Sequence, residues 1–322
     1  MFIYIYSNYN QGEKNMKIYF DKRLATDAQY DNLIKKYKEV DFISDPLRAK
    51  EAEVIVPLKP NLVRDINLVE YPNLKWIQYF SAGFDDVNIN HIKEHGVMFS
   101  NAQDVYSKAI AEDVITKIMY FNRSVGHYVD AMSKKIWKAA TFHQELTNST
   151  VLIMGVGSIG RELAKRLKAF EMKIIGYRKT NKPEKNFDKI VTTNEDLNDA
   201  IKIADYVVLA LPLNDETLYM FDKSKLDLMK SDALLINVAR GKVVKQDDLY
   251  DALLNKRIRG AGLDVFDPEP LPQDNKLWDL DNVFITPHNA SSSNLMMQNL
   301  FNMIAYNLDL YIRGETVINR IV

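Results

Sequence analysis

The sequence predicts an α/β protein with two domains, each built on a parallel β-sheet. Short apolar runs alternate with longer polar and amphipathic stretches, a pattern typical of strands joined by crossover helices. In the second half the apolar runs are continuous, which indicates strands covered on both faces. A length of 322 residues is enough for two domains of ordinary size.

The composition excludes several classes of protein. Hydrophobic residues make up 47% and charged residues 26%, which is typical of a globular chain. The net charge is only −1, so no overall field attracts nucleic acid or anionic lipid, and no apolar run is long enough to span a membrane. The absence of cysteine excludes disulfides, thiolate nucleophiles and Cys-based zinc sites. We therefore expect a cytoplasmic protein without a nucleic-acid partner, a membrane partner or a bound metal.

The first third of the chain predicts four strands. They are the apolar runs at residues 18–20, 54–56, 76–80 and 97–99, with a helix at 30–37. Because a strand starts near Met16, residues 1–15 are expected to be an extension rather than part of the core. The run at 2–6 is short, lacks a basic segment before it and makes a poor signal peptide.

A long helix is expected at 106–123, where apolar residues recur at helical spacing from Ile110 to Met119. A polar stretch extends to Thr150, and a second α/β series follows. Its strands are expected at 151–154, 174–177, 206–211, 234–238, 261–265 and 283–286. A helix at 293–312 follows the last of these strands and is expected to pack back on the first domain, which would make that domain discontinuous.

A glycine fingerprint follows the strand at 151–154. The motif G-x-G-x-x-G occupies 155–160 and leads into a predicted helix at 161–170. Gly155 permits a tight turn, Gly157 lets a pyrophosphate approach the backbone, and Gly160 lets helix and strand pack closely. The helix N-terminus offers N–H groups and partial positive charge to phosphates. The residues expected to bind a dinucleotide here are Gly155, Gly157, Ser158, Ile159 and Gly160.

The end of the next strand bears on which dinucleotide is bound. An NAD site places a carboxylate there to accept from the ribose 2′-hydroxyl. This chain has Arg178, Lys179 and Thr180 instead, and no carboxylate before Glu184. A guanidinium binds phosphate oxygens bidentately, so the sequence favours NADP(H) over NAD(H). The alternative is that Arg178 stacks on the adenine or points into solvent.

Three functional groups follow the fingerprint, each at the end of a predicted strand. They are Arg240, Glu269 and His288. A cation, a carboxylate and an imidazole downstream of a dinucleotide fingerprint indicate proton-coupled hydride transfer to a 2-oxo acid. Each could alone be a surface loop residue, but ligand crevices lie at the carboxyl ends of parallel strands.

These segments resemble the D-isomer-specific 2-hydroxyacid dehydrogenase family, in its glyoxylate/hydroxypyruvate reductase-like branch. The resemblance covers the chain from about Asn73 onward and is weak before Pro72. The matching segments are GVGSIG at 155–160, LPLNDET at 211–217, LINVARG at 235–241, GLDVFDPEP at 262–270 and ITPH at 285–288.

The resemblance implies roles for these residues in an NAD(P)-dependent 2-oxoacid reductase, an oxidoreductase that acts on a CH–OH group. Arg240 would grip the substrate carboxylate and polarise the carbonyl, His288 would donate the proton, and Glu269 would hold the imidazole. Pro212, Ala239 and Asp264 would join the cofactor-binding residues, with Asp264 on the carboxamide. The resemblance also implies two Rossmann-like/flavodoxin-like domains with the active site in the cleft between them. Residues 1–101 plus 291–322 would bind substrate, and 102–290 the dinucleotide.

The expected substrate is a small 2-oxo acid, and its carboxylate would meet the turn of Ser81, Ala82 and Gly83. The same residues would also make an ordinary tight turn. Glyoxylate, hydroxypyruvate and larger 2-oxo acids are not separated by the sequence. A homodimer is expected, with the helix at 106–123 as its contact. The alternative function is a regulatory protein that senses a nicotinamide dinucleotide on the same fold.

Overall fold

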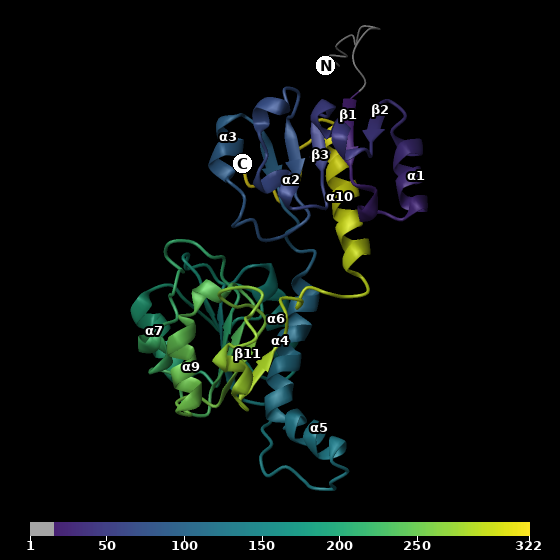
Figure 1. Cartoon of the computed structure of the whole chain (residues 1–322). Coiled ribbons are helices and arrows are strands. Elements are labelled where there is room, and N and C mark those ends of the chain that lie inside the picture. The colour runs from purple at the N-terminus through teal and green to yellow at the C-terminus, as the bar shows by residue number, and fades with distance from the viewer. Residues whose placement is uncertain (1–15) are drawn as a thin grey trace. The chain divides into compact units, whose positions relative to one another are not determined.

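The computed structural model describes residues 16–322 and divides into two compact units, which are considered separately. Unit 1 is Met1–Val105 with Leu295–Val322, described from Met16 onward, and unit 2 is Tyr106–Asn294. Each unit is built on one sheet of parallel strands, which confirms the predicted fold class (Figure 1). The run at 2–6 lies outside the described residues. Among the described helices, none combines the length and apolar character needed to cross a bilayer.

Unit 1 holds a five-stranded sheet in the order β2-β1-β3-β4-β5, the flavodoxin-like order. Its strands are β1 (Met16–Phe20), β2 (Val40–Ile43), β3 (Val54–Val56), β4 (Trp76–Gln78) and β5 (Met98–Ser100). Its helices in the N-terminal segment are α1 (Asp27–Lys36), α2 (Asn61–Arg64) and α3 (Ile89–Glu94). Thr26 begins α1 with a capping box, in which its hydroxyl accepts from the Gln29 N–H and the Gln29 side chain accepts from the Thr26 N–H.

The C-terminal helix α10 (Met296–Ile312) belongs to unit 1 (Figure 1). The buried Asn307 amide on this helix donates to Gln78 Oε1 at 2.7 Å, and the Tyr311 ring lies 4.9 Å from the Trp76 ring. Asp309 pairs with Lys36 at 2.6 Å. These contacts hold the last helix against β4 and α1, far from it in sequence.

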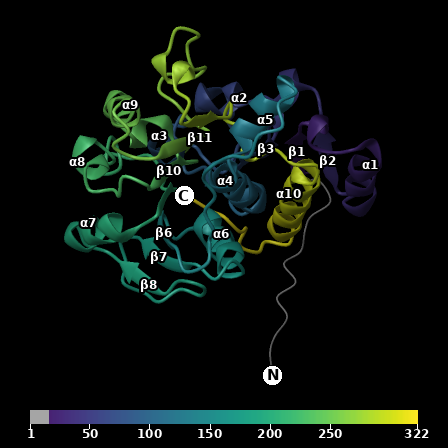
Figure 2. The same cartoon turned by 90° about the horizontal axis from the view of Figure 1, so that it is seen from below.

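Unit 2 holds a seven-stranded sheet in the order β12-β11-β10-β9-β6-β7-β8. Its strands are β6 (Thr150–Met154), β7 (Lys173–Tyr177), β8 (Lys189–Val191), β9 (Tyr206–Leu209), β10 (Leu234–Asn237), β11 (Gly260–Leu263) and β12 (Val283–Ile285). Its helices are α4 (Ser107–Asn122), α5 (Val125–Ser133), α6 (Ser158–Lys168), α7 (Asn194–Ile203), α8 (Lys223–Leu226) and α9 (Gln246–Leu254). Figure 2 shows the same elements from below. The order reverses between β6 and β9, as in a doubly wound dinucleotide-binding fold.

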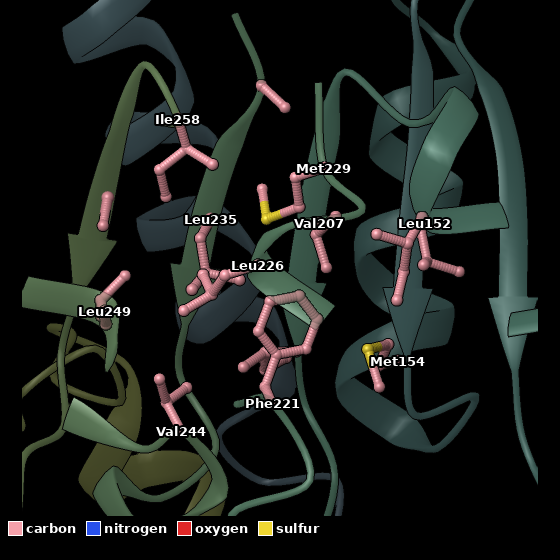
Figure 3. Packing of buried hydrophobic residues seen from close by; sticks show 14 of the residues in the cluster. Leu152, Met154, Val207, Phe221, Leu226, Met229, Leu235, Val244, Leu249 and Ile258 are labelled. Carbon is pink, nitrogen blue, oxygen red and sulfur yellow. The ribbon is translucent and has the colours of Figure 1, made fainter. Parts of the chain in front are cut away.

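Both faces of this sheet are buried, and successive residues of one strand serve opposite faces. Leu152 and Met154 of β6 belong to the cluster that includes residues of α7, α8 and α9, and Figure 3 shows part of it. Val151 and Ile153 belong to the cluster that includes residues of α4 and α6. This two-sided burial explains why the strands appear as continuous apolar runs.

Several described elements have no counterpart among the predicted ranges: the strands β2 and β8 and the helices α2, α3, α5, α7, α8 and α9. The strands β2 and β8 are short and lie at the sheet edges, where only partial burial is required. The helix α5 lies in the polar stretch that follows the long helix, where no element was predicted. The predicted strands at 76–80, 206–211, 234–238, 261–265 and 283–286 end earlier in the structure, so their last residues belong to turns at the carboxyl edge.

Candidate active site

The three predicted catalytic residues lie beyond the carboxyl ends of neighbouring strands in the unit 2 sheet. Strands β10, β11 and β12 are neighbours, and Asn237, Leu263 and Ile285 are paired in register at their carboxyl ends. Arg240 and His288 each lie three residues beyond their strand end, and Glu269 lies in the segment that follows β11. The alignment of the strands therefore brings the cation, carboxylate and imidazole to a common edge.

A short hydrogen-bonded turn places Arg240. The buried Asn237 accepts from the Ala239 N–H at 3.0 Å and donates to the Arg240 carbonyl at 3.0 Å. Gly241 follows, and a Cβ there would clash with the Phe266 carbonyl group, so the turn lies directly against the segment that leads to Glu269. Arg240 is half-buried, and its Nη1 donates to the Ala239 carbonyl at 2.7 Å.

Glu269 holds His288 by direct hydrogen bonding. Glu269 Oε2 lies 2.7 Å from His288 Nδ1, while Oε1 accepts from the Phe266 N–H at 2.9 Å. The carboxylate is therefore fixed by one backbone donor and fixes the ring in turn. With Nδ1 facing the carboxylate, Nε2 is the nitrogen able to donate a proton to a substrate. The His288 side chain is 49% exposed, which leaves it accessible to a ligand.

Asp264 anchors the backbone that carries His288. This residue is only 2% exposed, and its carboxylate accepts from Thr286 Oγ1 at 2.6 Å and from the N–H groups of Asn289 and Ala290 at 3.0 and 3.1 Å. Its carbonyl accepts from the His288 N–H at 2.8 Å. The side chain thus serves the His288 segment, a function that the sequence analysis did not foresee. The predicted contact with a carboxamide stays a prediction.

The glycine fingerprint forms the turn between β6 and α6 in the same unit. Gly155 has φ +111°, a backbone conformation that side chains rarely adopt. Gly157 is the N-cap of α6, and a Cβ there would meet no atom within 4 Å. No side chain caps α6 and its first turn holds no acidic residue, so the helix N-terminus is open to an anion. Ser158, Ile159 and Gly160 lie in that first turn, and this arrangement fits a dinucleotide pyrophosphate.

The basic cluster lies just beyond β7. Arg178 Nε donates to the Thr180 carbonyl at 3.0 Å, and Nη1 lies 3.4 Å from Glu184 Oε2. Its Nη2 is buried without a hydrogen-bond partner among the described residues. Lys179 is exposed and pairs with Glu216 at 2.6 Å. An unsatisfied guanidinium nitrogen fits a further anionic ligand, as a 2′-phosphate would be.

The remaining predicted residues occupy other positions. Pro212 is exposed beyond β9, and its carbonyl accepts from Thr217 Oγ1 at 2.7 Å. Ser81, Ala82 and Gly83 belong to unit 1, where they follow β4 and are half-buried. The Ser81 carbonyl accepts from the Ala102 N–H at 3.0 Å, so this turn is tied to the segment after β5. No cluster of potential metal ligands occurs within residues 16–322.

Some residues that shape the site were not predicted from the sequence. Asn237 is one of them, although a polar residue at the end of a buried strand is a cue that could have identified it. Lys117 and Asp113 on α4 are others, and the spacing of a lysine four residues after an aspartate is the cue for this pair. Glu184 is the first carboxylate after β7, and the sequence does not predict its contact with Arg178.

Comparisons with known proteins identify the family. Residues 115–290 match the model of the D-isomer specific 2-hydroxyacid dehydrogenase NAD-binding domain. The glyoxylate reductase of Pyrococcus horikoshii is 33% identical over 299 residues, which cover 89% of this chain and 85% of that protein.

Solved structures agree with this assignment. An acyclic imino acid reductase in complex with NADPH and D-Arg has a TM-score of 0.83 at 26% identity and covers 95% of this chain and 100% of its own. The NAD-complexed D-isomer specific 2-hydroxyacid dehydrogenase of Lactobacillus delbrueckii ssp. bulgaricus has a TM-score of 0.76 at 25% identity and covers 95% of this chain and 99% of its own.

These similarities confirm the predicted enzyme class, an oxidoreductase that uses a nicotinamide dinucleotide, and give no support to the regulatory alternative. The chain belongs to the D-isomer specific 2-hydroxyacid dehydrogenase family.

Proposed function

We propose that this protein reduces a small 2-oxo acid to the corresponding D-2-hydroxy acid with NADPH, and that glyoxylate is among its substrates. The observation that carries the proposal is the His288–Glu269 pair at 2.7 Å, at the same sheet edge as Arg240 and in the unit that holds the dinucleotide fingerprint. The glyoxylate reductase from Pyrococcus horikoshii, similar over most of the chain, supports the choice of substrate.

Arg240, His288 and Glu269 each have a separate role in the proposed reaction. Arg240 binds the substrate carboxylate and polarises the carbonyl oxygen, on which negative charge develops. His288, protonated at both ring nitrogens, gives the Nε2 proton to that oxygen, while Glu269 stabilises the imidazolium and fixes its orientation. A nicotinamide dinucleotide held at the glycine fingerprint of residues 155–160 would supply the hydride for the reduction. Ser81, Ala82 and Gly83 of unit 1 stay proposed as substrate-binding residues, through their backbone N–H groups.

A substrate panel tests this function. Glyoxylate, hydroxypyruvate, pyruvate and larger 2-oxo acids are each mixed with NADPH or NADH, and loss of absorbance at 340 nm is followed. We expect turnover of the small acids, and chiral analysis should show the D-isomer wherever the product has a stereocentre. The panel includes an acyclic imino acid, because one solved relative is named as an imino acid reductase. Turnover of imines alone, or of no panel member, would contradict the proposal.

The preference for NADPH rests on Arg178. Its Nη2 has no hydrogen-bond partner among the described residues, so its N–H groups are available to donate to a 2′-phosphate. The neighbouring Glu184 carboxylate would repel such a phosphate. We therefore expect opposite effects from the two residues. Arg178→Met should weaken NADPH binding by about 10- to 100-fold, the worth of one or two charge-assisted hydrogen bonds. Glu184→Gln should tighten it several-fold.

Dissociation constants from fluorescence titration measure this selectivity without turnover. NADH binding should change by less than about threefold in both variants, since the 2′-hydroxyl carries no charge to be attracted or repelled. Glu195→Gln, an exposed carboxylate on α7, removes the same charge from unit 2 and serves as the control. A preference for NADH in the unmodified protein, or equal losses for both cofactors in Arg178→Met, would sink this assignment.

We also propose a homodimer and a cytoplasmic location. The long helix α4 packs against the sheet of its own unit. The segment 125–142 that follows it exposes a set of apolar side chains, among which Trp137 is fully exposed and Met132 is 77% exposed. Further members of this apolar set are Val125, Val129, Ile136 and Phe142. A second copy that presents the same residues would cover them in a closed two-fold pair.

Light scattering should give twice the chain mass of 37.2 kDa for the native protein. The double substitution Met132→Asp and Trp137→Asp should yield monomers, because it places charges in the apolar contact. A monomeric native protein would contradict the dimer, and a variant that stays dimeric would place the contact elsewhere.

A further inference from the structure

A buried lysine connects α4 to the segment that carries His288. Lys117 lies on α4, and its side chain is completely inaccessible to solvent. Its stem crosses β11 at Gly262, where an added Cβ would lie 2.9 Å from Lys117 Cβ. The strand therefore leaves room for this side chain by having no side chain of its own there. A long charged residue in this position requires a specific set of partners.

The ammonium group has two polar partners. It forms an ion pair with Asp113, one helical turn earlier on α4, and it donates to Thr286 Oγ1 at 2.9 Å. Thr286 in turn donates its hydroxyl proton to Asp264 Oδ1 at 2.6 Å. Because Lys117 can only donate, it occupies a lone pair of the hydroxyl and directs the Thr286 proton toward Asp264. Hydrogen bonds in such a chain strengthen one another.

The chain of contacts ends at the backbone around His288. Asp264 receives the N–H groups of Asn289 and Ala290 on its carboxylate and that of His288 on its carbonyl. His288 has φ +49°, a left-handed conformation that is uncommon for residues other than glycine. The hydrogen bonds that Asp264 accepts from three successive N–H groups, those of residues 288 to 290, stabilise this conformation.

We propose that Lys117 is a positioning residue that acts through Thr286 and Asp264 to fix the His288 segment for proton transfer. This inference rests on the proposed role of His288 as the proton donor. Lys117 itself reaches neither substrate nor cofactor in this scheme. Its function is to hold the Thr286 hydroxyl, which in turn donates to Asp264.

The electrostatics of the cluster support a function other than stability. Burial raises the pKa of Asp113, Lys117 lowers it, and the negative charge of Asp264 raises it again, with a net upward shift. Burial therefore destabilises the charged form of Asp113 even though Lys117 lies beside it. Replacing a buried ion pair by apolar residues is often neutral or stabilising. The pair is thus better explained by the orientation that it imposes on Thr286 than by its contribution to folding.

The test uses the whole chain of 322 residues and compares variants of the ion pair with variants of Thr286. Asp113→Asn combined with Lys117→Met removes the ion pair without leaving a carboxylate unpaired. Thr286→Val breaks the connection while the ion pair remains, and Thr286→Ser restores the hydroxyl. Lys223→Met is the control, because Lys223 forms an exposed i,i+4 pair with Asp227 on α8. Hydrogen exchange of the Asn289 and Ala290 amides is measured with kcat and KM for glyoxylate.

We expect the Asn/Met double variant and Thr286→Val to exchange these two amides at least about tenfold faster and to lose about tenfold in kcat, with KM changed less than threefold. Thr286→Ser and Lys223→Met should resemble the unmodified protein. Unchanged exchange in a folded double variant would overturn the positioning proposal, whatever His288 does. If exchange accelerates but kcat stays constant while His288→Asn is also fully active, the acid role of His288 fails and the contact chain stands.

Discussion

Replacing His288 by Asn should lower kcat for 2-oxo acid reduction by about 10²–10⁴-fold, the usual contribution of a positioned general acid. Asn keeps a polar side chain near Glu269 but cannot release a proton at neutral pH. Binding of the 2-oxo acid should be affected much less, because the carboxylate is assigned to Arg240. Steady-state rates at saturating NADPH and glyoxylate measure the effect.

Glu269→Gln provides the matched comparison for this prediction. The amide can still hydrogen-bond to His288 Nδ1, which lies 2.7 Å from the native carboxylate, but it no longer stabilises imidazolium by charge. Its kcat should therefore fall by less than that of His288→Asn. If His288→Asn turns over at the native rate, or if Glu269→Gln is the more damaging change, the division of roles within the pair is wrong.

Replacing Arg240 by Met should produce the largest loss in kcat/KM, because one side chain is assigned two tasks. Loss of a donor aimed at developing oxyanion charge costs about 3–4 kcal/mol, or 10²–10³-fold, and loss of the carboxylate contact adds to it. We expect kcat to fall and KM to rise, whereas His288→Asn should change mainly kcat. Arg240→Lys should recover only part of the activity, since an ammonium cannot make the bidentate contact of a guanidinium.

Lys242→Met is the control for Arg240. Lys242 is an exposed cation two residues farther along the same turn, and its loss changes the local charge equally. Its kinetic constants should stay within about twofold of the native values, as is usual for a surface substitution. A comparable loss in Lys242→Met would show that general electrostatic attraction, rather than a specific contact of Arg240, accounts for the effect.

The sequence predicted the sheets well because of how they are buried. Central strands such as β6 and β10 are apolar on both faces, so their runs are continuous and distinctive. The edge strands β2 and β8 need fewer apolar residues, and their pattern merges with that of loops. The helix α5 escaped detection because its apolar residues are largely exposed and its segment has no core-facing stripe.

Short motifs predict the catalytic residues, whereas the residues that hold them in place could not be predicted in this way. Arg240, Glu269 and His288 lie beyond strand ends, a position that sequence order reveals. Their supports act across the chain: Lys117 contacts Thr286 over 169 positions. Such a contact depends on helix packing over Gly262 and leaves no local pattern. The pairing of Arg178 with Glu184 likewise depends on the fold of an irregular loop.

The most direct test of the central claim is the binding of oxamate, a 2-oxo acid analogue that is not reduced, to the protein with NADPH bound. The claim is that Arg240 binds the carboxylate of the 2-oxo acid and that His288 gives a proton to its carbonyl oxygen. It predicts that Arg240→Met weakens oxamate binding by at least about 100-fold, from two lost charge-assisted contacts, while His288→Asn changes it by less than about tenfold. Native oxamate affinity in Arg240→Met would contradict the account.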